Sequence, residues 1–348
     1  MLAPIRRILP GFPTVSAVIG SSLICPGEAS AHVKWFCAFD VAGQPRGLEN
    51  VLCPDFELLV GLALVVLVAG CLVEGTPVGA ALQRALDRVA GRLATDSELL
   101  VRALCGFFFV ALWTTGGMIL TPELKTDSSA VSWLQLALAA TMLWRRTLPL
   151  AALGIVFLFG LALRNYGLFH LMDYPIFLGL AAYLALTGLQ RDLFGMRPLD
   201  VVRWATAVTL MWASIEKWAY PEWSFPLFLA HPSLLLGYDD EFFMRAAGVI
   251  EFTLSFALLW TPLVRRAAAI ILLGMFVSAI PEFGKLDAIG HAPIIAVLLA
   301  IVGDSVSAPL ANRKWRLALA PACFVAALAT FLTLYYALHA ALFGTAII

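Results

Sequence analysis

The chain has 348 residues, of which 61% are hydrophobic and 13% are charged, and its formal net charge is zero. This composition excludes an ordinary soluble globular protein and indicates an integral membrane protein. No basic patch interleaved with aromatic residues and no glycine-rich phosphate loop occurs, so the sequence predicts no nucleic-acid and no nucleotide partner.

The N-terminal residues have the pattern of a secretory signal. Two arginines precede an apolar stretch over residues 8–25, and Ala29-Ser30-Ala31 has the small residues of a cleavage site. We therefore expect a signal peptide over residues 1–31 and a periplasmic segment over residues 32–56. Cleavage would make His32 the mature N terminus, and the alternative is an uncleaved anchor.

Two cysteines, Cys37 and Cys53, flank this periplasmic segment. The periplasm is oxidising, so a structural disulfide between them and a pair of free thiols are the two alternatives.

Ten apolar runs follow, with lengths suited to crossing about 30 Å of hydrocarbon. They are rich in Leu, Ala, Phe and Gly and do not alternate with polar residues, which favours helices over barrel strands. The runs cover residues 58–73, 101–120, 131–144, 148–163, 174–189, 204–220, 246–260, 267–280, 288–302 and 317–343. The predicted fold class is all-α, a polytopic membrane protein of about ten transmembrane helices. These helices form an N-terminal group within residues 57–190, a second group within residues 203–304 and a final helix over residues 317–343.

Positive charge alternates between the connecting segments. One set of segments carries Arg84, Arg88, Arg92 and Arg102, then Arg145 and Arg146, then Arg191, Arg197 and Arg203, then Arg265 and Arg266, then Arg313, Lys314 and Arg316. Short basic loops stay cytoplasmic, so we expect a bacterial inner-membrane protein with both mature termini in the periplasm. All five histidines then lie on the periplasmic side.

Three ionisable residues are candidates for a buried polar centre with a catalytic role. Glu251 lies about five residues inside its apolar run, and Glu216 and Lys217 lie at a similar depth in the preceding run. Ionisable groups in a bilayer cost roughly 2.5 to 3.5 kcal/mol each, so they need a partner or a function. An ion pair between Lys217 and Glu251 is feasible, because the two runs are antiparallel neighbours.

The histidines suggest a metal or proton site on the same side. Asp287 and His291 share a helical face, and His170 lies three residues before Asp173, so a carboxylate can orient each imidazole. The candidate metal ligands are His32, His170, His231, Asp287 and His291. A free amine beside the His32 imidazole would suit copper or another transition metal.

A Pro-Glu pair recurs at the periplasmic ends of three runs, at Pro122-Glu123, Pro221-Glu222 and Pro281-Glu282. One interpretation is a helix stop followed by an interfacial carboxylate. The other is an old internal duplication.

Residues 203–304 resemble the DoxX family of four-helix membrane proteins. The resemblance rests on Lys217, on Val249-Ile250-Glu251-Phe252, on Leu258-Leu259-Trp260 running into Arg265-Arg266-Ala267, and on Phe283-Gly284-Lys285-Leu286-Asp287. It implies an antiparallel four-helix bundle with Lys217 and Glu251 at the polar positions of the family. It also implies a link to membrane thiol and sulfur redox systems. The chain carries Glu216 where relatives usually have Gly.

The function expected from these features is that of a DoxX-like inner-membrane component of a redox or metal-handling system, with a polar site open to the periplasm. The alternatives are a secondary transporter for a metal ion or small anion and a non-catalytic accessory subunit. The expected partners are the lipid bilayer and a membrane or periplasmic protein. Trp212, Trp218 and Trp223 could shelter a quinone head group, although interfacial aromatic residues are also common membrane anchors.

Overall fold

The structure, a computed structural model, describes residues 33–306 and 313–346. Helices account for the regular structure, and no β-strand forms within these two ranges. The all-α prediction is confirmed for this part of the chain.

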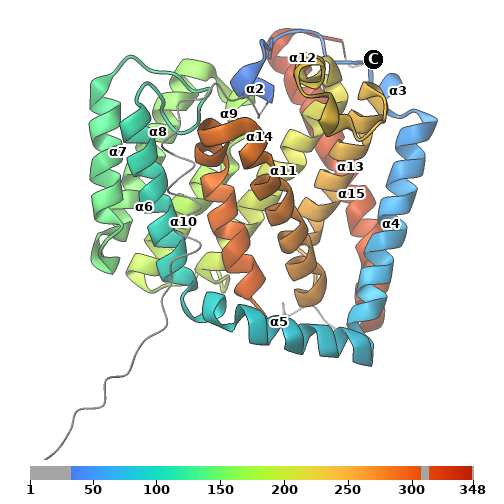
Figure 1. The fold of residues 1–348 in the computed structure, drawn as a ribbon, viewed down its shortest axis with the longest axis horizontal. Helices are drawn as coiled ribbons and strands as arrows, with labels where there is room; N and C mark the ends of the chain where they lie inside the picture. Colours follow the sequence, from blue (N-terminus) through green and yellow to red (C-terminus); the bar gives the residue numbers. More distant parts are fainter. Residues whose placement is uncertain (1–32, 307–312, 347–348) are drawn as a thin grey trace, which may run out of the picture.

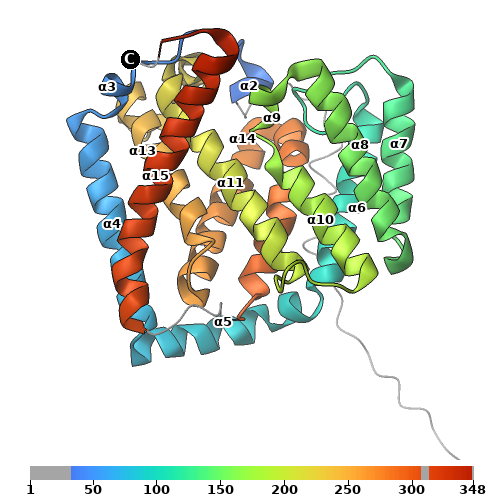
Figure 2. The same cartoon turned by 180° about the vertical axis from the view of Figure 1, so that it is seen from behind.

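The long helices pack side by side with their axes in roughly one direction (Figures 1 and 2). They are α4 (Pro54–Glu74), α6 (Ser97–Thr115), α7 (Ser129–Thr141), α8 (Leu148–Tyr166), α10 (Pro175–Leu189), α11 (Pro198–Ala219), α13 (Asp240–Ala257), α14 (Pro262–Gly303) and α15 (Arg313–Phe343). Helix α11 is central and contacts α10, α13, α14 and α15.

The two ends of this bundle differ. Helix α5 (Pro77–Thr95) lies across one end, which we call the α5 end (Figure 1). The opposite end, which we call the distal end, carries the short helices α2 (Val33–Phe36), α3 (Leu48–Val51), α9 (Leu168–Leu171) and α12 (Phe225–Ala230). Three single-turn helices complete the connections: η1 (Arg145–Thr147), η2 (Pro221–Ser224) and η3 (Pro232–Leu235).

Helix α14 is a hairpin of two helical halves. Its backbone leaves helical geometry at Gly284, where φ is 73° and ψ is −155°. This left-handed value suits glycine, which has no Cβ to clash. The halves run antiparallel, because Arg266 near the start of α14 donates a hydrogen bond of 2.8 Å to the carbonyl of Val302 near its end. The predicted runs 267–280 and 288–302 are these two halves.

The predicted run 101–120 is too long. Helix α6 ends at Thr115, and Gly116 and Gly117 follow with φ of 70° and 67°. The apolar residues Ile119 and Leu120 instead form a buried turn. Gln135 donates hydrogen bonds of 2.8 and 2.6 Å to the carbonyls of Met118 and Ile119. An apolar run can thus be a buried loop when neighbouring helices satisfy its backbone.

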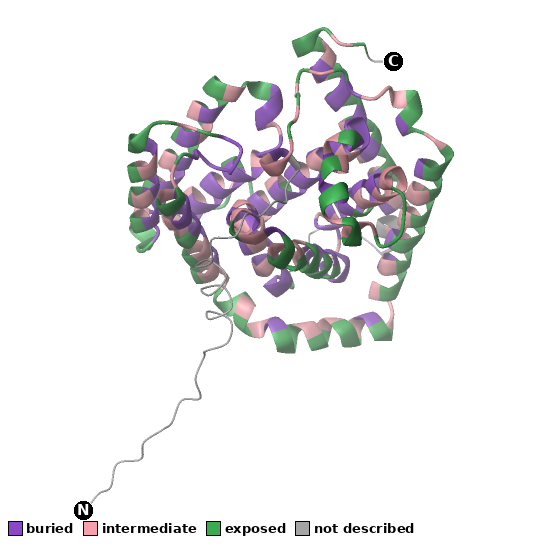
Figure 3. Cartoon of the chain, turned by 45° about the horizontal axis from the view of Figure 1, so that its top comes forward, coloured by how far each residue is buried: buried purple, intermediate pink, exposed green. Residues whose placement is uncertain are grey.

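Within the part of the chain that the structure describes, five helices are long and apolar enough to cross a membrane. They cover Pro54–Glu74, Ser97–Thr115, Arg145–Tyr166, Pro262–Gly303 and Leu319–Phe343. Their outer faces expose large apolar side chains, such as Val65 and Val66 on α4 and Leu153 and Phe157 on α8. Figure 3 shows the same distribution, with buried residues toward the middle of the bundle and exposed ones around it. Such a surface is suited to lipid rather than water.

Helix α5 is an amphipathic helix that follows directly after α4. Thr76 caps it by accepting a hydrogen bond of 3.2 Å from the amide of Gly79, and Pro77 occupies its first turn. Asp87 on α5 binds the Arg266 guanidinium at 2.6 Å. This last contact holds α5 against the start of α14.

Candidate functional site

The distal end is closed by residues 33–46, which we call the N-terminal strap. Arg46 at the end of the strap forms a bidentate ion pair with Glu241, at 2.5 and 2.8 Å. The Tyr220 hydroxyl donates to the carbonyl of Gly43 at 2.8 Å. The strap is therefore fixed to the helices that surround α11.

Lys34 on the strap is buried among carboxylates. Its Nζ donates hydrogen bonds to both Asp173 and Glu216, and all three side chains are at least nine-tenths buried. The ring centroids of Phe39 and Trp223 lie 5.8 and 5.7 Å from the same nitrogen. Carboxylates and aromatic faces both stabilise an ammonium group that has lost its water.

A second acid and base pair adjoins these residues. Glu123 Oε1 lies 2.6 Å from His170 Nε2, and the Glu123 carboxyl is buried. The other oxygen of Glu123 and the second oxygen of Asp173 are buried and accept no hydrogen bond from the described residues. We call Lys34, Glu123, His170, Asp173 and Glu216 the Lys34 centre.

The Lys34 centre holds more acidic than basic groups. Three carboxyls face one lysine and one histidine. Burial opposes the charge of Lys34, but Asp173, Glu216 and Glu123 outweigh it and raise the pKa of the ammonium above its usual range. Burial also raises the pKa of Asp173, against the effect of Lys34 and with help from Glu123. The pKa of Glu123 falls, because His170 and Lys34 outweigh the cost of burial. Asp173 therefore binds a proton more tightly than an ordinary aspartate side chain does.

The predicted pair Lys217 and Glu251 forms. The Nζ of Lys217 lies 2.6 Å from Glu251 Oε2, and the Glu251 side chain is 10% exposed while that of Lys217 is 26% exposed. Close packing of α11 on α13 sets this distance, since a Cβ on Gly248 would fall 2.2 Å from the Trp218 ring. Glu216 precedes Lys217 on α11, so this helix turn links the pair to the Lys34 centre.

The histidines pair separately rather than together. His291 Nδ1 lies 3.0 Å from Asp287, as predicted, and the His291 ring also packs on Trp35 with centroids 4.9 Å apart. His231 Nδ1 lies 2.6 Å from Glu282. Within residues 33–306 and 313–346, no three His, Cys, Asp or Glu side chains converge as a metal site would require. His32 lies outside the described residues.

The expected pair of His170 with Asp173 is wrong. His170 binds Glu123, and Asp173 binds Lys34. The reason is that α9 ends at Leu171, so His170 and Asp173 do not lie on one regular helix. Cys37 and Cys53 are free thiols, so the disulfide alternative is also wrong.

The three Pro-Glu carboxylates share an arrangement that sequence reasoning missed. Glu123 pairs with His170, Glu282 pairs with His231, and Glu222 lies 3.9 Å from Arg46. Each carboxylate therefore meets a basic side chain from a different segment at the distal end.

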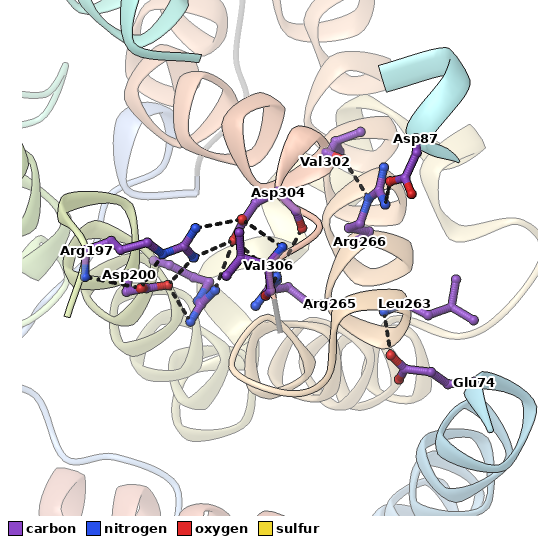
Figure 4. Close-up of polar contacts among 11 residues, drawn as sticks. Glu74, Asp87, Arg197, Asp200, Leu263, Arg265, Arg266, Val302, Asp304 and Val306 are labelled. Atoms are coloured by element: carbon purple, nitrogen blue, oxygen red, sulfur yellow. Dashed lines mark hydrogen bonds and ion pairs between the residues drawn. The ribbon is translucent and has the colours of Figure 1, made fainter. Parts of the chain in front are cut away.

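The α5 end has the opposite charge pattern (Figure 4). Asp304 after α14 accepts from Arg197 at 3.0 and 2.9 Å and lies 3.1 Å from Arg265. Arg203 lies 3.5 Å from the same carboxylate and 2.9 Å from Asp200. Three arginines thus share two aspartates, and Arg203 and Arg265 are buried.

Comparison with known proteins gives no relative. No protein-family model, no curated protein and no solved structure matches this chain.

Proposed function

We propose that the chain crosses a bacterial inner membrane ten times, with the distal end in the periplasm and the α5 end in the cytoplasm. The ten predicted runs fall largely within helices of the structure. Each ion pair formed between described residues joins two groups that the charge rule puts on the same side. The described arginine-rich connections also gather at the α5 end, as in the network around Asp304 (Figure 4).

Within this topology the proposed function is that of a DoxX-like component of an inner-membrane redox system that exchanges a proton with the periplasm. One observation carries the proposal: Lys34 is buried between Asp173 and Glu216, with Glu123 beside them. One lysine and one histidine cannot neutralise three buried carboxyls, and buried carboxyls relieve such an imbalance by holding protons. A redox reaction that consumes or releases protons needs a group of this kind.

Two rival functions receive less support. Metal handling requires converging ligands, whereas His170, His231 and His291 each bind a different carboxylate. The fourth described histidine, His339, contacts the hydroxyl of Tyr220 instead. A transporter requires a polar path between the ends. Arg203 and Glu216 on α11 are 13 residues or about 20 Å apart, and the hydroxyls of Thr206 and Ser214 between them are bonded to their own helix.

The test is a pH titration followed by difference infrared spectroscopy of the purified protein in lipid nanodiscs. We expect a protonated-carboxyl band to persist at neutral pH and to change in Glu216→Gln and Asp173→Asn. Glu57→Gln is the matched control, because Glu57 is an exposed acid on α4. Identical neutral-pH spectra for the wild type, Glu216→Gln and Asp173→Asn would rule out the proton-exchange proposal. Proton uptake into liposomes by the protein alone would favour the transporter.

A further inference from the structure

A cavity of about 450 Å³ lies at the α5 end, far from the Lys34 centre. Its walls come from the junction of α5 and α6, from η1, from the end of α10, from the start of α11 and from the segment after α14. The volume is within the range of about 300 to 1,000 Å³ that is usual for small-ligand sites. The inner wall includes Tyr183, Leu186 and Ala300, so the cavity has both an apolar part and a charged part.

The charged part is lined by three arginines and three acidic residues, namely Arg145, Arg191 and Arg197 with Glu98, Asp192 and Asp304. Arg145 pairs with Glu98 at 3.1 Å, and Arg197 is held by Asp304. Arg191 also lines the cavity and is exposed, and no acidic group among the described residues pairs with it. Arg145 keeps about half of its side chain exposed, so both Arg145 and Arg191 can turn toward a ligand.

The wall behind Arg197 adds positive charge. Arg197, Arg203 and Arg265 share only Asp200 and Asp304, which leaves an excess of one positive charge. The Nε and Nη1 groups of Arg203 and Arg265 are buried and donate no hydrogen bond to the described residues. Because arginine stays protonated, this excess is permanent and favours an anion in the cavity.

We propose that this cavity binds a phosphate group, with Arg145 and Arg191 as its direct donors and the arginines around Asp304 as its electrostatic support. A guanidinium fork matches two phosphate oxygens at once. Basic pockets between membrane helices near the cytoplasmic surface hold lipid head groups in this way. The phosphate has two possible sources, a phospholipid of the adjacent leaflet and a soluble phosphate compound. The apolar wall would accommodate the glycerol part of a lipid.

Native mass spectrometry of protein released from phosphatidylglycerol nanodiscs tests the lipid source. Thermal unfolding in detergent with added inorganic phosphate tests the soluble source. The test variant is the double substitution Arg145→Gln and Arg191→Gln. The control is Arg84→Gln with Arg88→Gln, which removes the same charge from exposed positions on α5 outside the cavity.

We expect the test variant to bind phosphate more weakly by about fivefold per arginine, or on the order of thirtyfold in total. Retained lipid that is lost in the test variant but kept in the control identifies a phospholipid site. Stabilisation of the lipid-free wild type by phosphate, absent in the test variant, identifies a soluble phosphate ligand. If neither signal is seen, or if the control loses binding as strongly as the test variant, the proposal is wrong.

Discussion

The two ends of the bundle bury an excess of ionisable groups of opposite sign. At the distal end, two carboxylates surround one buried lysine with a third nearby, whereas at the α5 end three arginines surround one buried aspartate (Figure 4). Both arrangements bury charge that is not fully paired. They differ in whether the excess groups can change their protonation state.

Carboxyls can take up a proton, but arginines cannot lose theirs. The Lys34 centre can therefore change its charge state, while the network around Asp304 has a fixed charge. This difference suits the distal end to proton exchange and the α5 end to anchoring and to anion binding. For the same reason, we expect substitutions at the two ends to differ in their effects on stability.

The largest loss is expected from Asp304→Asn. This change leaves Arg197, Arg203 and Arg265 without their shared carboxylate, and removing one member of a buried ion pair costs about 3 to 5 kcal/mol. The measurements are folded yield and thermal unfolding in detergent. Asp55→Asn is the control, because Asp55 also lies near an arginine, Arg245, but its side chain is 59% exposed. An equal loss in both variants would contradict the special role of burial at Asp304.

A somewhat smaller loss is expected from Lys34→Met. We expect about 3 kcal/mol at neutral pH, because two buried carboxyls lose their cation. Acidification should restore part of this loss, since Asp173 and Glu216 can become neutral. Thermal unfolding across a pH series measures this recovery, and Lys125→Met at an exposed position on the same end is the control. No recovery at acidic pH would show that protonation does not relieve the charge of the centre.

The pair of Lys217 and Glu251 should show an asymmetry between single and double variants. Glu251→Gln or Lys217→Met alone should lower stability by about 1 to 2 kcal/mol, reduced by the exposure of Lys217 to solvent. The double variant should recover most of this loss. Thermal unfolding of the four proteins forms a double-mutant cycle. A double variant as unstable as the single variants would mean that the two groups are energetically independent.

The smallest expected effect is a change in pH dependence for Asp173→Asn. The pKa of Asp173 is raised in the folded protein, so the folded state holds this proton more tightly than the unfolded state. Wild-type stability should therefore lose a contribution as pH rises from the ordinary Asp range through the folded pKa. The variant lacks this contribution, so the stability of the wild type relative to the variant should fall with rising pH. A constant or rising difference would mean that the Asp173 pKa is not raised.

Sequence reasoning succeeded where a pattern is local. The apolar runs predicted most helix positions, and the spacing of Asp287 and His291 predicted their contact. Lys217 and Glu251 were also predictable, because they lie at equal depth on consecutive antiparallel helices. The end of α6 was not predictable from the sequence, because Gly116 and Gly117 stop the helix inside a run that remains apolar.

The Lys34 centre was beyond sequence reasoning for a physical reason. Lys34 is 139 residues from Asp173 and 182 residues from Glu216, and no periodicity connects a four-residue helix with groups so distant. One signal was present, namely that Pro122-Glu123 places an acid directly after an apolar run. The burial of Glu123, and hence its role, follows only from the packing of α9 and the N-terminal strap.

The most direct test of the contrast between the two ends is the side of the membrane that each one faces. Single cysteines at Ser128 and Ser233 probe the distal end, and single cysteines at Asp192 and Ser305 probe the α5 end. All four positions are exposed. With the native cysteines replaced by serine, an impermeant thiol reagent added to intact cells should label the first two positions and spare the last two. Labelling of Asp192→Cys or Ser305→Cys from outside would contradict the proposed orientation. The assignment of the Lys34 centre to proton exchange with the periplasm would then be wrong.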